Sequence, residues 1–170
     1  MKLFYPKFAW DAIRKNRRSY IPYMLATLFV VAVFHILRNI TWMPYLIHQR
    51  GASEITMTAS LGSFVIAIFS AIFLFYTSSF LMKQRKKEFG LYNVLGMEKR
   101  HLARLMSVEI LLVAVFSLFF GISGGALFSQ LFFLIFYKMI RMEADLTMVI
   151  PRGAVTETLS LFGILFCLVL

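Results

Sequence analysis

Long apolar segments constrain the fold of this chain more than any other feature. Residues 61–82 carry no charged side chain, and residues 105–137 carry only one, Glu109. A third segment, residues 21–37, has His35 as its only acidic or basic residue. The hydrocarbon core of a bilayer is about 30 Å thick, and a helix of about 20 apolar residues crosses it. These segments therefore predict three transmembrane helices.

A fourth uncharged segment, residues 158–170, has only 13 residues. At about 1.5 Å per residue it reaches roughly 20 Å, which is short of the bilayer. We expect an all-α membrane protein, a polytopic helical bundle with three full spans and an incomplete fourth, cut from the front of a longer protein. The expected layout is a cytoplasmic amphipathic segment (1–20), a first span (21–37), a short external loop (38–60), a second span (61–82), a cytoplasmic coupling loop (83–104), a third span (105–137), an external loop (138–157) and the start of a fourth span (158–170).

The composition agrees with a membrane protein. Hydrophobic residues make up 60% of the chain and charged residues 15%, whereas a soluble domain has about 25% charged residues. A net charge of +10 is also typical of nucleic-acid binding, but here Lys and Arg cluster at the ends of the apolar segments. That placement indicates membrane orientation and contact with anionic lipid headgroups. We expect membrane lipids, and no nucleic acid, as partners.

The distribution of basic residues predicts the topology. Six Lys or Arg lie in residues 1–20 and seven in residues 83–104, against two in residues 38–57 and three in residues 138–157. Loops rich in Lys and Arg stay on the cytoplasmic side, so we expect the N-terminus and the 83–104 loop in the cytoplasm. Residues 7–15 predict a short amphipathic helix on the inner membrane surface. A disordered basic arm is the alternative.

The basic loop between the second and third spans is patterned beyond what orientation needs. Residues 88–95 can form two helical turns that place Phe89, Tyr92 and Leu95 close to one side. Gly96 suits the left-handed position that ends a helix. A second helix then runs on into the third span. The loop is either a surface that grips a cytosolic partner or an interfacial connector without one.

Small side chains form two stripes that favour close helix packing. On the third span they recur every four residues, at Ser117, Gly121, Gly125 and Ser129. A weaker stripe on the second span consists of Ala59, Ser63, Ala67 and Ala71. We expect the two stripes to pack on each other. Alternatively, the glycines mark a kink in the long third span.

Few polar residues suggest chemistry. Glu109 lies five residues after Arg104, so we expect it to reach the inner interface or to pair with a base there; an intramembrane carboxylate can also be functional. His35 lies near the outer end of its span and is expected to be interfacial. With the single Cys167 and no helical His pair we expect no metal site. No catalytic residue or cofactor is predicted.

The 83–104 loop resembles a known family. The run Arg-Lys-Lys-Glu-Phe-Gly-Leu-Tyr at residues 85–92, the Leu-Gly-Met at 95–97 and Glu109 in the next span are similar to the FtsX-like permease domain of ABC transporters. The short loop after the first span and the basic run at residues 14–20 narrow the resemblance to the BceB type, the bacitracin and antimicrobial-peptide resistance permeases. The resemblance covers residues 7–137.

The resemblance implies a non-catalytic membrane subunit in the bacterial plasma membrane, driven by a separate cytosolic ABC ATPase. The sequence has no G-x-x-x-x-G-K-[ST] loop of its own. The implied cargo is an antimicrobial peptide, which is exported or released from a lipid-linked cell-wall precursor. The residues carried over as the ATPase docking surface are Glu88, Phe89, Gly90, Tyr92, Leu95 and Gly96. The alternative is a signalling or scaffold protein that regulates a sensor histidine kinase or a cell-wall hydrolase.

Overall fold

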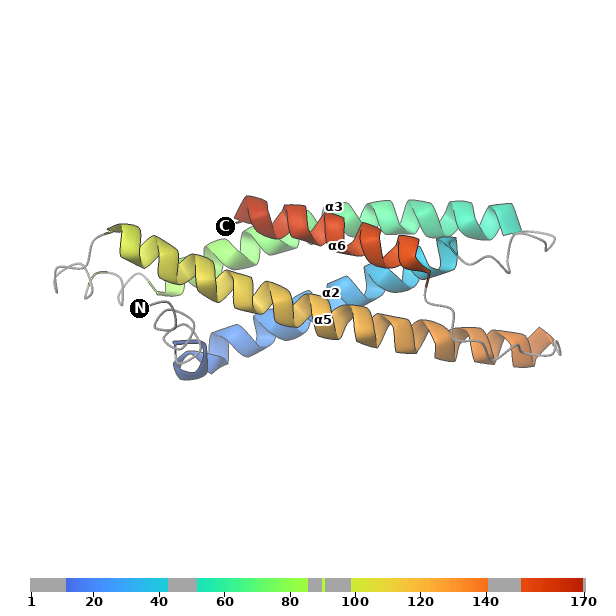
Figure 1. Ribbon diagram of the computed structural model, residues 1–170, viewed down its shortest axis with the longest axis horizontal. Helices are drawn as coiled ribbons and strands as arrows, with labels where there is room; N and C mark the ends of the chain where they lie inside the picture. The colour runs from blue at the N-terminus through green and yellow to red at the C-terminus, as the bar shows by residue number, and fades with distance from the viewer. Residues whose placement is uncertain (1–11, 43–51, 86–89, 91–98, 141–150, 170) are drawn as a thin grey trace.

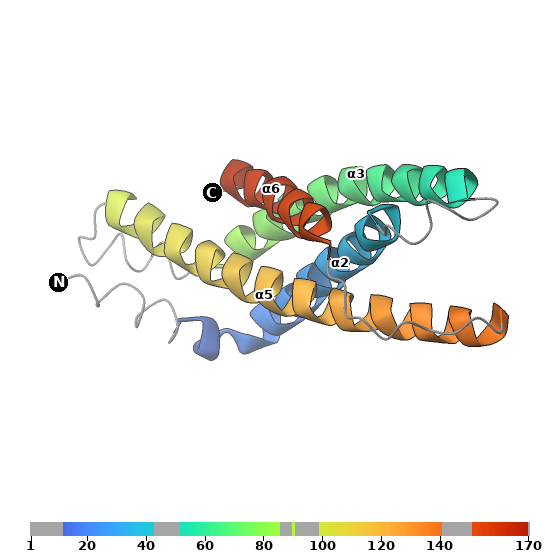
Figure 2. The same cartoon turned by 45° about the vertical axis from the view of Figure 1, so that its right-hand side comes forward.

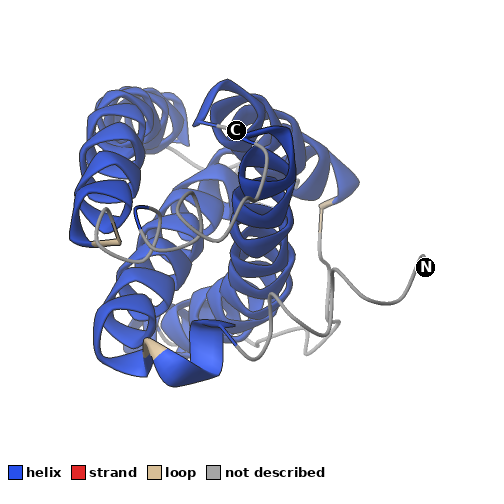
Figure 3. Cartoon of the chain, turned by 90° about the vertical axis from the view of Figure 1, so that its left-hand side faces the viewer, coloured by secondary structure: helices blue, strands red, loops and turns tan. Residues whose placement is uncertain are grey.

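A computed structural model describes residues 12–42, 52–85, 90, 99–140 and 151–169, and these described residues include four long helices. In chain order they are α2 (Arg17–Thr41), α3 (Ala52–Gln84), α5 (Lys99–Ile140) and α6 (Arg152–Val169) (Figure 1). The described residues contain no strand, as the end-on view in Figure 3 also shows. The expectation of an all-α helical bundle is confirmed.

The helices run up and down, and α2 lies at the centre of the packing. It contacts α3, α5 and α6, and its contact with α5 is the most extensive (Figures 1 and 2). The start of α2, the end of α3, the start of α5 and the end of α6 all lie at one end of the bundle. We call this the loop end, because the chain leaves α3 and enters α5 there, and we call the other the far end.

All four helices are long and apolar enough to cross a membrane, as the sequence predicts for three of them. The fourth differs from the prediction, because α6 begins at Arg152 rather than at residue 158 and has 18 residues. At about 1.5 Å per residue it is roughly 27 Å long. The extra turns include Glu157, which the apolar pattern excluded and which the fold pairs with a base on α2.

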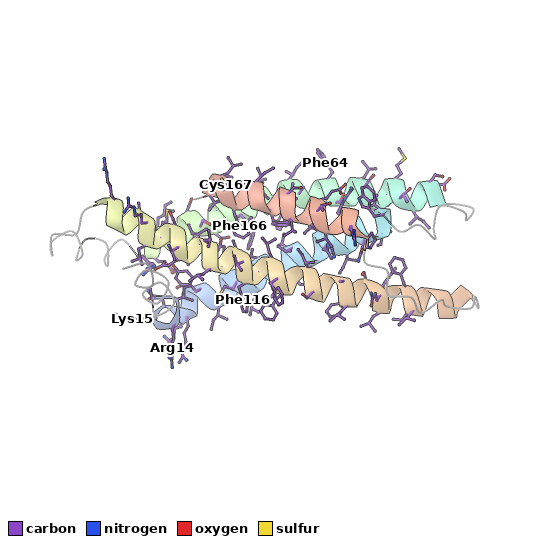
Figure 4. The ribbon with its side chains drawn as sticks, in the orientation of Figure 1. Arg14, Lys15, Phe64, Phe116, Phe166 and Cys167 are labelled. Atoms are coloured by element: carbon purple, nitrogen blue, oxygen red, sulfur yellow. The ribbon has the colours of Figure 1, made fainter. Side chains whose placement is uncertain are left out.

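The bundle buries a narrow core and exposes large apolar side chains outward. Val31, Val113 and Phe162 are almost completely buried, and the rings of Phe34 and Phe162 meet edge to face with centroids 5.7 Å apart. Figure 4 labels Phe64, which points away from the bundle. Exposed apolar faces of this extent are unfavourable in water and suit contact with lipid chains.

The small-residue stripe of α5 faces α2 and not α3. A Cβ atom added to Gly121 would lie 2.7 Å from Val31 Cγ1, and one added to Gly125 would lie 2.9 Å from the Ala32 carbonyl oxygen. The expected pairing of the two stripes is not what the structure shows, because α3 and α5 pack on different sides of α2. The stripe of α5 thus lets this helix approach α2 closely. The helix α5 runs without interruption from Lys99 to Ile140.

Candidate functional site

A buried ion pair joins three helices at the loop end. Arg85, the residue after α3, contacts Glu109 of α5 through Nη1. The same nitrogen donates a hydrogen bond to the Tyr20 hydroxyl of α2 at 3.0 Å. Tyr20 in turn donates to Glu109 Oε2 at 2.7 Å. We call Tyr20, Arg85 and Glu109 the Arg85 cluster.

The Arg85 cluster is withdrawn from solvent. The side chains of Arg85 and Glu109 are 7% and 1% exposed. The Arg85 guanidinium carbon also lies 5.8 Å from the centre of the Tyr20 ring, within reach of a cation–π attraction. One cavity beside these side chains holds about 20 Å³, which is room for about one water molecule. A second cavity, of about 360 Å³, borders Tyr20 and Arg85 on the side of Ser19 and Gln84. The low exposure of both charged side chains nevertheless makes each the main counter-charge of the other.

Two further hydrogen bonds tie α2 to α3 around this cluster. The Ser19 hydroxyl donates to Gln84 Oε1 at 2.6 Å, and the hydroxyls of Tyr23 and Ser78 lie 3.2 Å apart. The Ser19–Gln84 bond is exposed, whereas the Tyr23–Ser78 pair is buried, and polar side chains buried between apolar helices are stable when they find such partners. The last turns of α3 are consequently held to the first turns of α2 immediately before the chain leaves α3.

A second polar group lies at the far end and attaches α6 to α2. Glu157 forms an ion pair with Arg38 and accepts a hydrogen bond from Trp42 Nε1 at 3.1 Å. A Cβ atom on Gly153 would lie 2.7 Å from the Trp42 ring, so α6 approaches the indole closely. We call Arg38, Trp42 and Glu157 the Glu157 cluster. Its two charged side chains are 18% and 37% exposed, so this cluster is partly solvated.

His35 is fully buried within the bundle, which differs from the plain interfacial histidine expected from its position near the end of a span. The packing of α6 covers it, and Nδ1 lies 3.1 Å from Thr158 Oγ1. Because the Thr158 hydroxyl donates to the Ala154 carbonyl, it accepts from His35. The network therefore assigns the ring proton to Nδ1. Next to it, Asn39 donates to Ser129 at 2.7 Å, so both polar side chains join helices.

Comparison with known proteins places these helices in a family. Residues 60–170 match the model of the FtsX-like permease C-terminal family. The chain belongs to the FtsX-like permease family.

The permease also has relatives whose similarity extends through most of its length. It is 31% identical over 153 residues to the uncharacterized ABC transporter permease YvcS of Bacillus subtilis (89% of this chain, 24% of the relative). It is 26% identical over 158 residues to the bacitracin export permease protein BceB of the same organism (93% and 24%). For the ABC transporter permease protein YxdM, also from Bacillus subtilis, the values are 29% over 162 residues (94% and 26%). The permease chain thus spans about a quarter of the length of these relatives, and the predicted resemblance to the BceB type is confirmed.

Of the predicted docking residues, the structure describes only Gly90. Gly90 is helical and exposed, and nothing lies within 4 Å of a Cβ atom added there. Glu88, Phe89, Tyr92, Leu95 and Gly96 lie outside the described residues. Their docking role stays a prediction, and the Arg85 cluster shows only how the chain enters this loop.

Glu109 pairs with a base, as expected, but the base is Arg85 and not Arg104, which is exposed on α5. Sequence reasoning assigned Arg85 to the loop motif and overlooked Tyr20. The available signal was depth: all three polar residues lie near the same end of their apolar segments, where neighbouring helices in an up-and-down bundle bring them together.

One cavity away from the Arg85 cluster is mostly apolar. A cavity of about 600 Å³ opens between α2, α3 and α5 towards the far end. Its lining is apolar apart from Glu54 and Thr58. Among the residues that the structure describes, no three His, Cys, Asp or Glu side chains gather as metal ligands would. The polar chemistry of the described bundle lies at its two ends.

Proposed function

We propose that this chain belongs to the membrane subunit of an ABC transporter and that a separate cytosolic ATPase drives it. The single observation that carries this is the position of the Arg85 cluster, which joins α2, α3 and α5 at Arg85, the first residue of the family motif. Family membership supports the proposal, as does the lack of a phosphate-binding loop in the sequence.

The proposed ATPase docking surface is the short connection that follows Arg85. Glu88 offers a carboxylate to basic groups of the ATPase, while Phe89 and Tyr92 supply aromatic area. Truncation of such aromatic anchors often costs about 2 kcal/mol or more of binding free energy. Gly90, which is exposed, leaves room for close approach, and Gly96 allows the turn into α5.

Co-purification tests this surface. In the complete protein, Phe89→Ala with Tyr92→Ala is expected to abolish retention of the ATPase while membrane insertion stays intact. The matched control is Lys86→Gln with Lys87→Gln. These two charges are proposed to contact headgroups, and their substitution leaves Phe89 and Tyr92 unchanged. Retention of the ATPase at wild-type yield by the aromatic variant would show that the loop is a passive connector.

The proposed orientation puts the loop end in the cytoplasm, in agreement with the basic residues that gather there. Arg14 and Lys15 at the start of the described chain point away from the bundle (Figure 4), where they can meet anionic headgroups. The test uses single cysteines at Ser53 and Gln84 in a Cys167→Ser background. A membrane-impermeant thiol reagent should label position 53 in intact cells and position 84 only after permeabilisation. The reverse pattern would invert the topology.

The proposed cargo is an antimicrobial peptide, exported or released from a lipid-linked cell-wall precursor. The support is similarity to a relative named as a bacitracin export permease. Deletion of the complete gene should lower the tolerated bacitracin concentration several-fold, and the complete gene should restore it only in a strain whose ATPase is active. If the complete gene restores tolerance fully beside a catalytically inactive ATPase, the chain works as a scaffold or signalling protein without transport.

A further inference from the structure

We infer that the Arg85 cluster is the positioning site through which movement of the docking loop, the chain between Arg85 and α5, reaches the membrane helices. The inference rests on the proposed function, because it assumes that an ATPase holds the loop. It adds the route by which force leaves the loop. That route consists of Tyr20, Arg85 and Glu109, which lie outside the predicted docking surface.

A single nitrogen atom, Arg85 Nη1, connects the three helices. Arg85 Nη1 contacts both Glu109 Oε2 and the Tyr20 hydroxyl, and these two groups are hydrogen-bonded to each other at 2.7 Å. Each side of this triangle joins a different pair among α2, α3 and α5. A displacement of Arg85 therefore pulls on two other helices at once.

Arg85 and Glu109 lie on opposite sides of the docking loop in the chain. Arg85 is the last described residue before the docking loop, and Glu109 lies on α5, the helix into which the loop runs. The ion pair thus connects the chain segment that precedes the docking loop with the helix that follows it. Without the pair, α3 and α5 would be coupled only indirectly, through α2 and α6, because they share little direct contact.

Burying the charges of Arg85 and Glu109 has a cost in desolvation free energy. Replacing a buried ion pair by apolar side chains of similar volume is often neutral or stabilising, whereas removing one partner is strongly destabilising. Stability alone therefore gives no reason to keep Arg85 and Glu109 charged at this depth. A directional, hydrogen-bonded link fixes the relative position of three helices more specifically than interchangeable apolar contacts do.

This argument separates a positioning role from a merely structural one. The variant Arg85→Met/Glu109→Leu removes both charges together and keeps apolar volume, so it should fold and insert. The matched control is Arg38→Met/Glu157→Leu, which removes the ion pair at the far end. That pair joins α2 to α6 and has no connection to the docking loop.

The experiment measures helix movement in the complete protein, purified with its ATPase and reconstituted in nanodiscs. Spin labels are placed at Tyr76 of α3 and Phe119 of α5, which are 74% and 66% exposed, in a Cys167→Ser background. The distance distribution is recorded without nucleotide and with ATP and vanadate. We expect a nucleotide-dependent shift in the wild type and in the far-end control. In Arg85→Met/Glu109→Leu we expect ATPase retention at wild-type yield and loss of the shift.

The outcomes distinguish the inference from the function on which it rests. Failure of the wild type to retain an ATPase, or to show any shift, would overturn the proposed function and the inference with it. A wild-type shift in Arg85→Met/Glu109→Leu would overturn the inference alone. If that variant does not fold, Tyr20→Phe replaces it, since it removes one hydroxyl and leaves the charges paired. It should reduce the shifted population at least twofold, and an unchanged population would equally overturn the inference.

Discussion

The two ion pairs at opposite ends of the bundle have the same chemistry and different surroundings. Arg85 and Glu109 are 7% and 1% exposed, whereas Arg38 and Glu157 are 18% and 37% exposed. A fully desolvated charge carries a penalty of several kcal/mol that only a close partner and further hydrogen bonds offset. A partly solvated pair keeps much of its hydration and is screened by salt.

The surroundings also differ in what each pair joins. The Arg85 cluster contains a third member, Tyr20, which brings in α2 and completes a closed triangle of contacts. The Glu157 cluster attaches α6 to α2, with Trp42 as its third member. Equal chemistry at the two ends therefore predicts unequal consequences when a partner is removed, and three measurements order them.

The largest effect is expected at Glu109. Its replacement by Leu leaves the Arg85 guanidinium buried without its counter-charge, so the free energy of unfolding should fall by about 3–5 kcal/mol. The measurement is the midpoint of SDS-induced unfolding of the detergent-purified protein. The double variant Arg85→Met/Glu109→Leu should recover most of this loss. If Glu109→Leu lowers the free energy of unfolding by less than about 1 kcal/mol, the buried ion pair contributes no more than an exposed one. That result would contradict the expected difference between the two ends of the bundle.

An intermediate effect is expected between the two clusters, where α5 crosses α2. A Cβ atom on Gly121 would lie 2.7 Å from Val31 Cγ1 and 3.1 Å from the Leu28 carbonyl oxygen. Gly121→Ala must therefore separate the helices or displace Val31, which should cost about 1–3 kcal/mol of unfolding free energy in the same titration.

The matched control for Gly121 lies three residues further along the same helix. A Cβ atom on Gly124 meets nothing within 4 Å, so Gly124→Ala should be neutral or slightly stabilising through helix propensity. Adding Val31→Ala to Gly121→Ala should restore part of the loss, because it removes Val31 Cγ1, the atom nearest to the new methyl group. Equal effects at positions 121 and 124 would contradict the close crossing.

How much the sequence could predict depended on whether a signal was local. Apolar length predicted the first three helices, and the four-residue spacing of small side chains identified the face of α5 that packs closely. Neither signal names the partner helix. The stripe of α5 contacts α2, and only the tertiary arrangement decides which pair of helices forms.

Polar residues were predicted less well, since their environment depends on neighbours distant in sequence. His35 lies near the end of an apolar run and looked interfacial, but α6 covers it, 123 residues further along the chain. Glu157 lay outside the predicted fourth helix because a charge interrupts the apolar pattern, and Arg38 supplies its partner. Glu109 was expected to pair with a base, but the sequence could not distinguish Arg85 from Arg104 without the register of α3 against α5.

The smallest effect is expected at the Glu157 cluster. Glu157→Gln keeps the side-chain volume and an acceptor for Trp42, and removes an ion pair that is partly solvated. After discounting for solvent screening, the loss in unfolding free energy should be below about 1 kcal/mol. It should shrink further between low salt and 0.5 M salt, since screening already weakens the wild-type pair. The loss at Glu109 should change less over the same range, because the Arg85 and Glu109 side chains are only 7% and 1% exposed. Equal salt dependence at the two sites would show that solvent reaches the Arg85 cluster as readily as the Glu157 cluster.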